Sequence, residues 1–149
     1  MEAKRDPEKL KQKLLDFARG FPLFQLLGLE LLDLGPRWAK CQLTARPELL
    51  NPNGVVHGGV VATLIDTSIA QSLLMTDEYQ SVRDTKGSLS TIDLHIKYLR
   101  PVNAGKLVCE ATIVHLGKRV IHAHAVVRGE HDKDIALGDA TLMMVSGQT

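Results

Sequence analysis

Hydrophobic and polar residues follow two periods along this chain, and each period predicts a type of element. Near the N-terminus apolar residues recur at helical spacing, which predicts an amphipathic helix over residues 7–21 and a short helical turn over 24–27. Elsewhere apolar and polar residues alternate one by one, which indicates strands with one buried face. Five segments alternate in this way: 38–46, 91–97, 107–115, 120–128 and 135–145. Residues 29–34 are expected to form a further strand, paired with 38–46 as a hairpin. Short connections containing glycine separate the later segments and favour antiparallel neighbours.

The segment 58–75 is apolar on nearly every side. It is too long for one strand, and its alanine and leucine content favours a helix. Because a helix that is apolar all round is buried, we expect it at the centre of the fold. The predicted order is helix, two strands, buried helix, four strands, with a polar connection over 76–87. A curved antiparallel sheet wrapped around the central helix would bury it, which is an α+β architecture.

Composition narrows the classes of function. The 18 basic and 17 acidic side chains nearly balance, so the concentrated basic surface of a nucleic-acid binder is not expected. No apolar run approaches the ~20 residues of a membrane span, and the charged N-terminus has no apolar core of signal-peptide length. Cys41 and Cys109 stand alone in alternating segments, as buried reduced thiols do. We therefore expect a cytoplasmic protein, with one domain over residues 1–149 and an N-terminal helical extension over 1–22.

Two glycines, Gly58 and Gly59, stand at the start of the predicted central helix. Glycine costs about 1 kcal/mol relative to alanine inside a helix, so its presence here calls for a reason. A bare helix start lets a substrate approach the unpaired N–H groups, whose dipoles stabilise a developing oxyanion. The alternative is a tight turn that only permits close packing of helix and sheet.

Asp66 interrupts the apolar helix, and a buried acid is costly unless it is paired or functional. It is a candidate base or nucleophile, and the alternative is a structural carboxylate bonded to Thr63 or Thr67. Gly58 and Asp66 are eight residues apart, which is ~12 Å along a helix. One reacting carbonyl cannot touch both, so if both act on one substrate, two subunits must supply them.

The histidines and the remaining motifs are less specific. His57 precedes the helix and is a candidate base or a structural hydrogen-bonding group. His122 and His124 share a strand face, but no cysteine or carboxylate cluster accompanies them, so no metal site is predicted. Asp93 and His95 share a face without a nucleophile, and no phosphate loop, dinucleotide fingerprint or Gly-x-Ser-x-Gly is present. No cofactor is expected.

The joint spacing of Asn51, His57-Gly58-Gly59 and Asp66, followed by the segment 90–101 that ends in Tyr-x-x-Pro, resembles the hotdog-fold acyl-CoA thioesterases. The resemblance covers nearly the whole chain. It is strongest to the branch with the phenylacetate-pathway thioesterases and the mammalian thioesterase superfamily members. It implies a homodimer formed by edge pairing of the sheets, often assembled further into a homotetramer, with an acyl- or aroyl-CoA as substrate.

The resemblance also implies roles for residues. Gly58 would donate its N–H to the thioester oxygen, with Gly59 beside it in the substrate site, and His57 would shape the loop. Asn51 would orient the thioester or the attacking water, although Asn53 competes for this position. Asp66 of the facing subunit would activate water or attack directly, and Thr91 would position it or the water. The cations expected to bind the CoA phosphates are Arg100, Lys118 and Arg119.

Alternatives share this fold. A non-catalytic acyl-CoA sensor would ordinarily carry a DNA-binding segment, for which the N-terminal helix is too short. A hotdog dehydratase or hydratase would carry a different motif of histidine and acid. The acyl group, and the choice between CoA and acyl carrier protein, are left open by the sequence.

Overall fold

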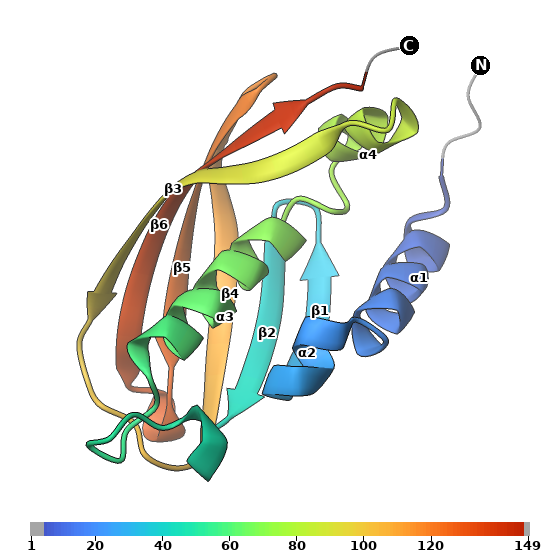
Figure 1. Ribbon diagram of the computed structural model, residues 1–149. Coiled ribbons are helices and arrows are strands. Elements are labelled where there is room, and N and C mark those ends of the chain that lie inside the picture. Colours follow the sequence, from blue (N-terminus) through green and yellow to red (C-terminus); the bar gives the residue numbers. More distant parts are fainter. Residues whose placement is uncertain (1–4, 148–149) are drawn as a thin grey trace.

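The computed structural model of the protein describes residues 5–147 and contains one antiparallel sheet that curves around a helix (Figure 1). Its six strands lie in the order β1-β2-β4-β5-β6-β3, so β1 and β3 form the two edges. The strand bounds are β1 Leu29–Gly35, β2 Trp38–Thr44, β3 Ser88–Tyr98, β4 Lys106–Leu116, β5 Val120–Arg128 and β6 Asp134–Val145. Each lies where the sequence predicts a strand, so the α+β hotdog architecture is confirmed.

The helices are α1 Pro7–Arg19, α2 Pro22–Leu27, α3 Gly58–Gln71 and α4 Asp77–Asp84, with short 3-10 turns at η1 Pro47–Leu49 and η2 Glu130–Asp132. The predicted first helix ends two residues early, at Arg19. The short helical turn predicted over 24–27 is confirmed as α2, which begins at Pro22, where proline fits a first turn. Helix α3 ends four residues before the predicted boundary at 75, and Ser72 caps it.

Helix α4 occupies the segment predicted as a polar connection, so that prediction is wrong. Thr76 caps the helix by accepting a hydrogen bond from the Tyr79 N–H. Only Gln80 and Val82 of α4 are buried, and Tyr79 and Val82 are the only aromatic or aliphatic side chains of this eight-residue helix, too few to mark it in the sequence. Local capping and acidic residues in the first turn form this helix without a long apolar stripe.

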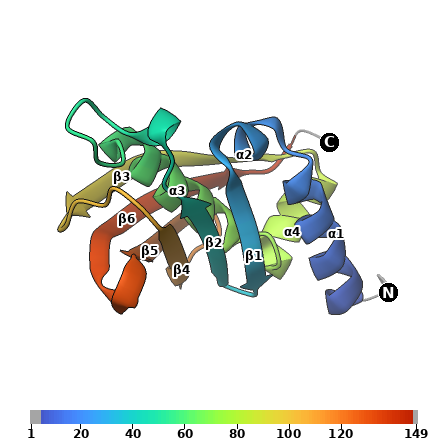
Figure 2. The ribbon, with the colours of Figure 1, turned by 90° about the horizontal axis from the view of Figure 1, so that it is seen from below.

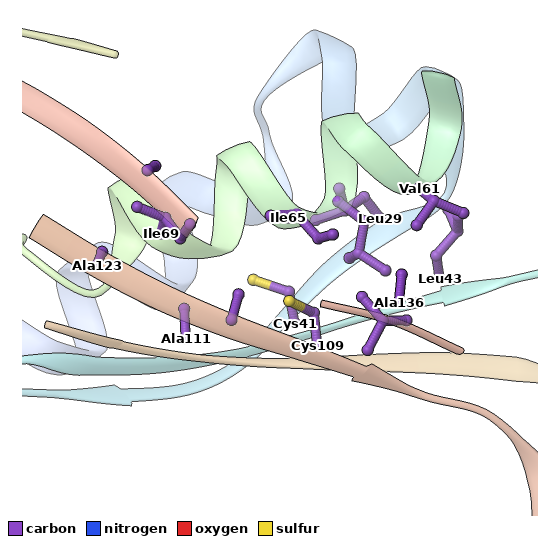
Figure 3. Packing of buried hydrophobic residues seen from close by; sticks show 14 of the residues in the cluster. Leu29, Cys41, Leu43, Val61, Ile65, Ile69, Cys109, Ala111, Ala123 and Ala136 are labelled. Atoms are coloured by element: carbon purple, nitrogen blue, oxygen red, sulfur yellow. The ribbon is translucent and has the colours of Figure 1, made fainter. Parts of the chain in front are cut away.

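The core lies between α3 and the concave face of the sheet (Figure 3). Val61, Ile65 and Ile69 point from α3 into a layer of strand residues that includes Cys41 and Cys109. Only this face of α3 is buried. Its opposite face is half-buried within one chain, so the expectation that α3 is buried all round is only partly met. A helix face that its own chain leaves partly uncovered is available for another subunit or a ligand.

Cys41 and Cys109 are opposite each other on β2 and β4, fully buried and not joined by a disulfide. Burial raises the pKa of Cys41 to about 11 and that of Cys109 to about 12, although Ser68 opposes the shift in both. Thiols in this state are protonated at neutral pH and are therefore poor nucleophiles. They belong to the core rather than to a reactive site.

Helix α1 packs against edge strand β1, with α4 at the same end of the view in Figure 2, and residues of α1 and α4 line one cavity. Leu14 is buried there, and the Lys11 Nζ lies 2.6 Å from Asp33 Oδ1, which lowers the pKa of Asp33 through a hydrogen bond. Phe17, on the same predicted stripe, is 71% exposed. Phe17 is exposed because it faces an open cavity instead of the sheet.

Candidate active site

The start of α3 presents one N–H group that has no partner among the described residues. His57 caps the helix with an extended backbone, and its Nδ1 accepts from the Gly59 N–H at 2.8 Å. The N–H groups of Val60 and Val61 both reach the His57 carbonyl oxygen, at 2.9 and 3.3 Å. Gly58 is the remaining donor of the first turn. The helix start can therefore offer the Gly58 N–H, and not the Gly59 N–H, to an external oxygen.

A cavity of about 360 Å³ opens in front of this helix start. Gly58, Asn51, Tyr98 and Arg100 contribute to its lining. The Tyr98 hydroxyl donates to the Gly58 carbonyl oxygen at 2.8 Å and holds the end of β3 against the helix start. A methyl group on Gly58 would lie 3.2 Å from the Tyr98 ring, so glycine keeps this contact free of strain. Tyr98 stands in the motif segment, but nothing in the pattern of residues assigned it this contact.

The loop before α3 is held by Asn51. Its Oδ1 accepts from the N–H groups of Asn53 and Val55 at 2.9 and 3.3 Å. Asn53 is exposed and contributes only its backbone, whereas Asn51 lines the cavity. Asn51 is therefore placed better than Asn53 for contact with a ligand, and its amide NH₂ is the part of the side chain left over from the loop.

Asp66 lies on the half-buried face of α3 and accepts a hydrogen bond from Thr91 on edge strand β3, with Oγ1 and Oδ1 2.7 Å apart. The threonines of the helix itself do not hold it, since the Thr63 hydroxyl donates to the Gly59 carbonyl oxygen instead. The alternative of a carboxylate bonded to Thr63 or Thr67 is thus wrong. The hydroxyl that binds Asp66 belongs to Thr91, which the family resemblance placed beside Asp66 or the water. One Asp66 oxygen remains for a ligand or water.

The candidate residues form two groups within one chain. Gly58, Asn51 and Arg100 lie at the end of the sheet where β3 finishes, and Arg100 donates to the Asp134 carbonyl oxygen at 2.7 Å. Lys118 and Arg119 lie in the β4–β5 turn at the other end, where Met144 N–H bonds to the Arg119 carbonyl oxygen. The three expected phosphate-binding cations therefore do not meet in one chain.

Asp66 lies between the two groups. It is eight residues from Gly58 on one continuous helix, which is ~12 Å along its axis. Its partner Thr91 pairs in register with Leu142, which pairs with Ile121 near the start of β5. The carboxylate is thus nearer the Lys118 end of the sheet than Gly58 is.

The histidines on the outer face of the sheet are engaged with neighbouring side chains. The Nδ1 atoms of His122 and His124 lie 3.2 Å from Thr141 Oγ1 and 3.0 Å from Asp139 Oδ1. His95 is 3.1 Å from a carboxylate oxygen on its own strand. Between residues 5 and 147, no three histidine, cysteine or acidic side chains are grouped so that they could hold a metal ion.

Comparison with known proteins shows the family. A sequence model described as the thioesterase superfamily matches residues 53–136, more than half of the chain. A Mycobacterium tuberculosis protein that is named provisionally as an esterase is 31% identical over 121 residues, which make up 81% of this chain and 84% of that protein. Its structure superposes with a TM-score of 0.76 at 26% identity, covering 87% of this chain and 100% of that one.

Two further relatives have more specific names. The Escherichia coli protein named medium/long-chain acyl-CoA thioesterase YigI is 25% identical over 137 residues, 86% of this chain and 88% of YigI. A variant of the phenylacetic acid degradation protein PaaI from Thermus thermophilus has a TM-score of 0.70 at 27% identity, covering 83% of this chain and 98% of that one. No helix in the described range is long and apolar enough to cross a membrane. With the sheet, the helix start and the matched segment taken together, the chain belongs to the thioesterase superfamily.

Proposed function

We propose that the protein is an acyl-CoA thioesterase that hydrolyses an acyl- or aroyl-CoA to the free acid and CoA. The observation that carries the proposal is the division of α3 into two functional parts, a free Gly58 N–H at its start and the Asp66–Thr91 pair two turns further on. An oxyanion donor and a carboxylate are the two groups that hydrolysis of a thioester needs. The name of YigI supports CoA as the thiol carrier.

In the proposed reaction, the Gly58 N–H donates to the thioester oxygen. Asp66 accepts a proton from a water molecule, whose oxygen attacks the carbonyl carbon, and the developing oxyanion is stabilised at the helix start. Collapse of the tetrahedral intermediate breaks the carbon–sulfur bond and releases the CoA thiolate, which takes up the proton from Asp66. The Thr91 hydroxyl holds one carboxylate oxygen so that the other points to the water. Direct attack by Asp66, through an acyl-enzyme anhydride, is the other route that this pair supports.

The site is proposed to lie between two subunits. Because Gly58 and Asp66 are ~12 Å apart on one rigid helix, a single carbonyl reaches both only if each comes from a different chain. A second copy placed with its α3 antiparallel along the half-buried face would bring the partner subunit's Gly58 to Asp66. The same arrangement brings the Arg100 end of one chain towards the Lys118 and Arg119 end of the other. The cations that are separated in one chain would then surround one CoA.

The test is release of CoA thiol from aromatic, short-chain and long-chain acyl-CoAs by the wild type and by Asp66→Asn. We expect the substitution to reduce turnover by orders of magnitude while the molar mass in solution and the melting temperature stay the same. Asn keeps the volume and one acceptor for Thr91 but takes no proton. Equal turnover by both proteins would remove Asp66 from the mechanism. A wild type that hydrolyses no member of the panel would contradict the proposed activity.

A further inference from the structure

A second and larger cavity, of about 880 Å³, lies between α1, α2, α4 and the last turn of α3. Apolar residues from all four helices line it, among them Leu10, Phe17, Phe24, Ala70 and Tyr79. It is open to solvent, which is why Phe17 is the most exposed large apolar side chain of the described residues. Nothing in the proposed reaction steps uses this cavity.

The cavity adjoins the Asp66–Thr91 pair on both of the elements that hold the pair. Ala70 lines it and lies one turn after Asp66, on the same side of α3. Leu89 also lines it and lies two residues before Thr91, on the same face of β3. An acyl chain whose carbonyl carbon lies at Asp66 would have to extend about one helical turn, ~5 Å, to reach the residues that line this cavity.

The charges around the cavity agree with a thioester whose polar part stays outside. Its basic residues, Arg5, Lys9, Lys13 and Arg83, outnumber the acidic Asp6 and Asp84. Arg5, Asp6 and Lys9 lie at the start of α1, Lys13 lies one turn further along it, and Arg83 and Asp84 end α4, whereas Ala70 and Leu89, which adjoin the Asp66–Thr91 pair, are apolar. Long basic side chains at the opening attract an anionic substrate and leave the apolar lining to its neutral part.

We propose that this cavity is the acyl subsite and that it takes an extended aliphatic chain; the inference rests on the proposed thioesterase function. Leu10 and Phe17 line it seven residues apart on α1, which is ~10 Å along the helix and longer than one aromatic ring. The volume is at the upper end of the range of about 300–1,000 Å³ that is usual for ligand pockets. Helices α1 and α2 precede residue 53, where the family match begins, so this wall is an addition to the matched segment.

The test measures binding and does not require hydrolysis. S-alkyl-CoA thioethers with butyl, octyl and dodecyl chains are titrated calorimetrically into the full-length protein. Each methylene that is fully buried strengthens binding by roughly fourfold, and a methylene in a half-open cavity strengthens it by less. We expect at least about a tenfold gain from butyl to octyl in the wild type. Ala70→Leu, which fills the cavity beside Asp66, and Phe17→Glu, which places a carboxylate in it, should abolish that gain.

Leu26→Glu is the matched control, since Leu26 is 70% exposed on the adjoining helix α2 but does not line the cavity. It should keep the chain-length dependence of the wild type. An undiminished gain in Phe17→Glu and Ala70→Leu, or no thioether binding at all, would overturn the inference. So would a change in oligomeric mass in these variants without a change in chain-length dependence, because the cavity would then hold the partner subunit. Chain-length-dependent binding without hydrolysis would refute the thioesterase function and leave the acyl-chain site standing.

Discussion

Replacing Gly58 by proline removes one N–H group from the start of α3 while leaving the backbone in a conformation that proline adopts. Gly58 is the first residue of the helix, the position where proline is most favourable. The preceding residue, His57, is not in the helical region that a following proline disfavours, and its ψ of 133° lies within the range of about 120 to 160° that is usual before a proline. The lost N–H has no partner among the described residues, so no internal hydrogen bond is broken.

Gly58→Ala is the control that separates the N–H from the added bulk. Its Cβ would lie 3.2 Å from the Tyr98 ring, as the proline Cβ would, and Tyr98 is 56% exposed and can shift by a few tenths of an ångström. Both variants therefore share this steric cost, and only proline lacks the donor. Removal of one oxyanion-hole donor costs on the order of 10² to 10³ in kcat, which is about 3 to 4 kcal/mol.

The assay compares kcat, KM and melting temperature of the two variants on the best acyl-CoA. We expect Gly58→Pro to turn over at least about 100 times more slowly than Gly58→Ala, with similar KM values and melting temperatures within a few degrees. A proline variant within a few fold of the alanine variant would refute the role of this N–H. The helix start would then serve only to pack α3 against β3.

Three further outcomes are expected. Mixing Gly58→Pro with Asp66→Asn chains during refolding should restore about one quarter of wild-type activity. Half of the dimers are then mixed, and each mixed dimer has one intact site out of two. No recovery of activity would place both groups in one chain. Thr91→Val should lower kcat about tenfold and Thr91→Ser should restore it, since only the hydroxyl holds Asp66; equal losses in both would indicate a steric role. Because burial raises the pKa values of Cys41 and Cys109 from 9.0 to about 11 and 12, above pH 9 the unfolded chain loses thiol protons that the folded chain keeps. The free energy of unfolding should therefore fall by about 1.4 kcal/mol per thiol between neutral pH and pH 10, and a Cys41→Ala, Cys109→Ala double variant, measured by urea denaturation, should lack this part of the decline.

The sequence predicted the sheet because each strand has one face in the core. Strand β5 begins and ends where the alternation of its residues begins and ends, since every second side chain from Ile121 to Val127 is buried. Helix α4 lacks such a pattern. Thr76 caps it, and in the sequence a capping threonine cannot be told apart from the other threonines of the chain. Residues that bury little leave little trace in the order of apolar and polar positions.

Asp66 and its partner Thr91 also differ in how far the sequence alone reveals them. Asp66 could be recognised because a carboxylate interrupts an apolar helix, and that signal needs no knowledge of the fold. Its hydrogen bond to Thr91 crosses 25 positions of sequence, and spacing along the chain offered only Thr63 and Thr67 as alternative partners. Only the packing of β3 against α3 selects Thr91. The position of Thr91 in the family pattern suggested the contact, whereas periodicity alone did not.

Helix α3 determines more of the proposed function than any other element, because its two faces have different tasks. Ile65 and Ile69 fix one face in the core, so the helix cannot rotate or slide without opening the layer that contains Cys41 and Cys109. The opposite face carries Asp66 and Ala70, and their positions are therefore as rigid as the core itself. A second subunit that docks on this face meets a carboxylate at a fixed position along α3 and a cavity one turn beyond it. The reaction would need both subunits, whereas the choice of acyl chain would depend on α1 of the subunit that supplies Asp66.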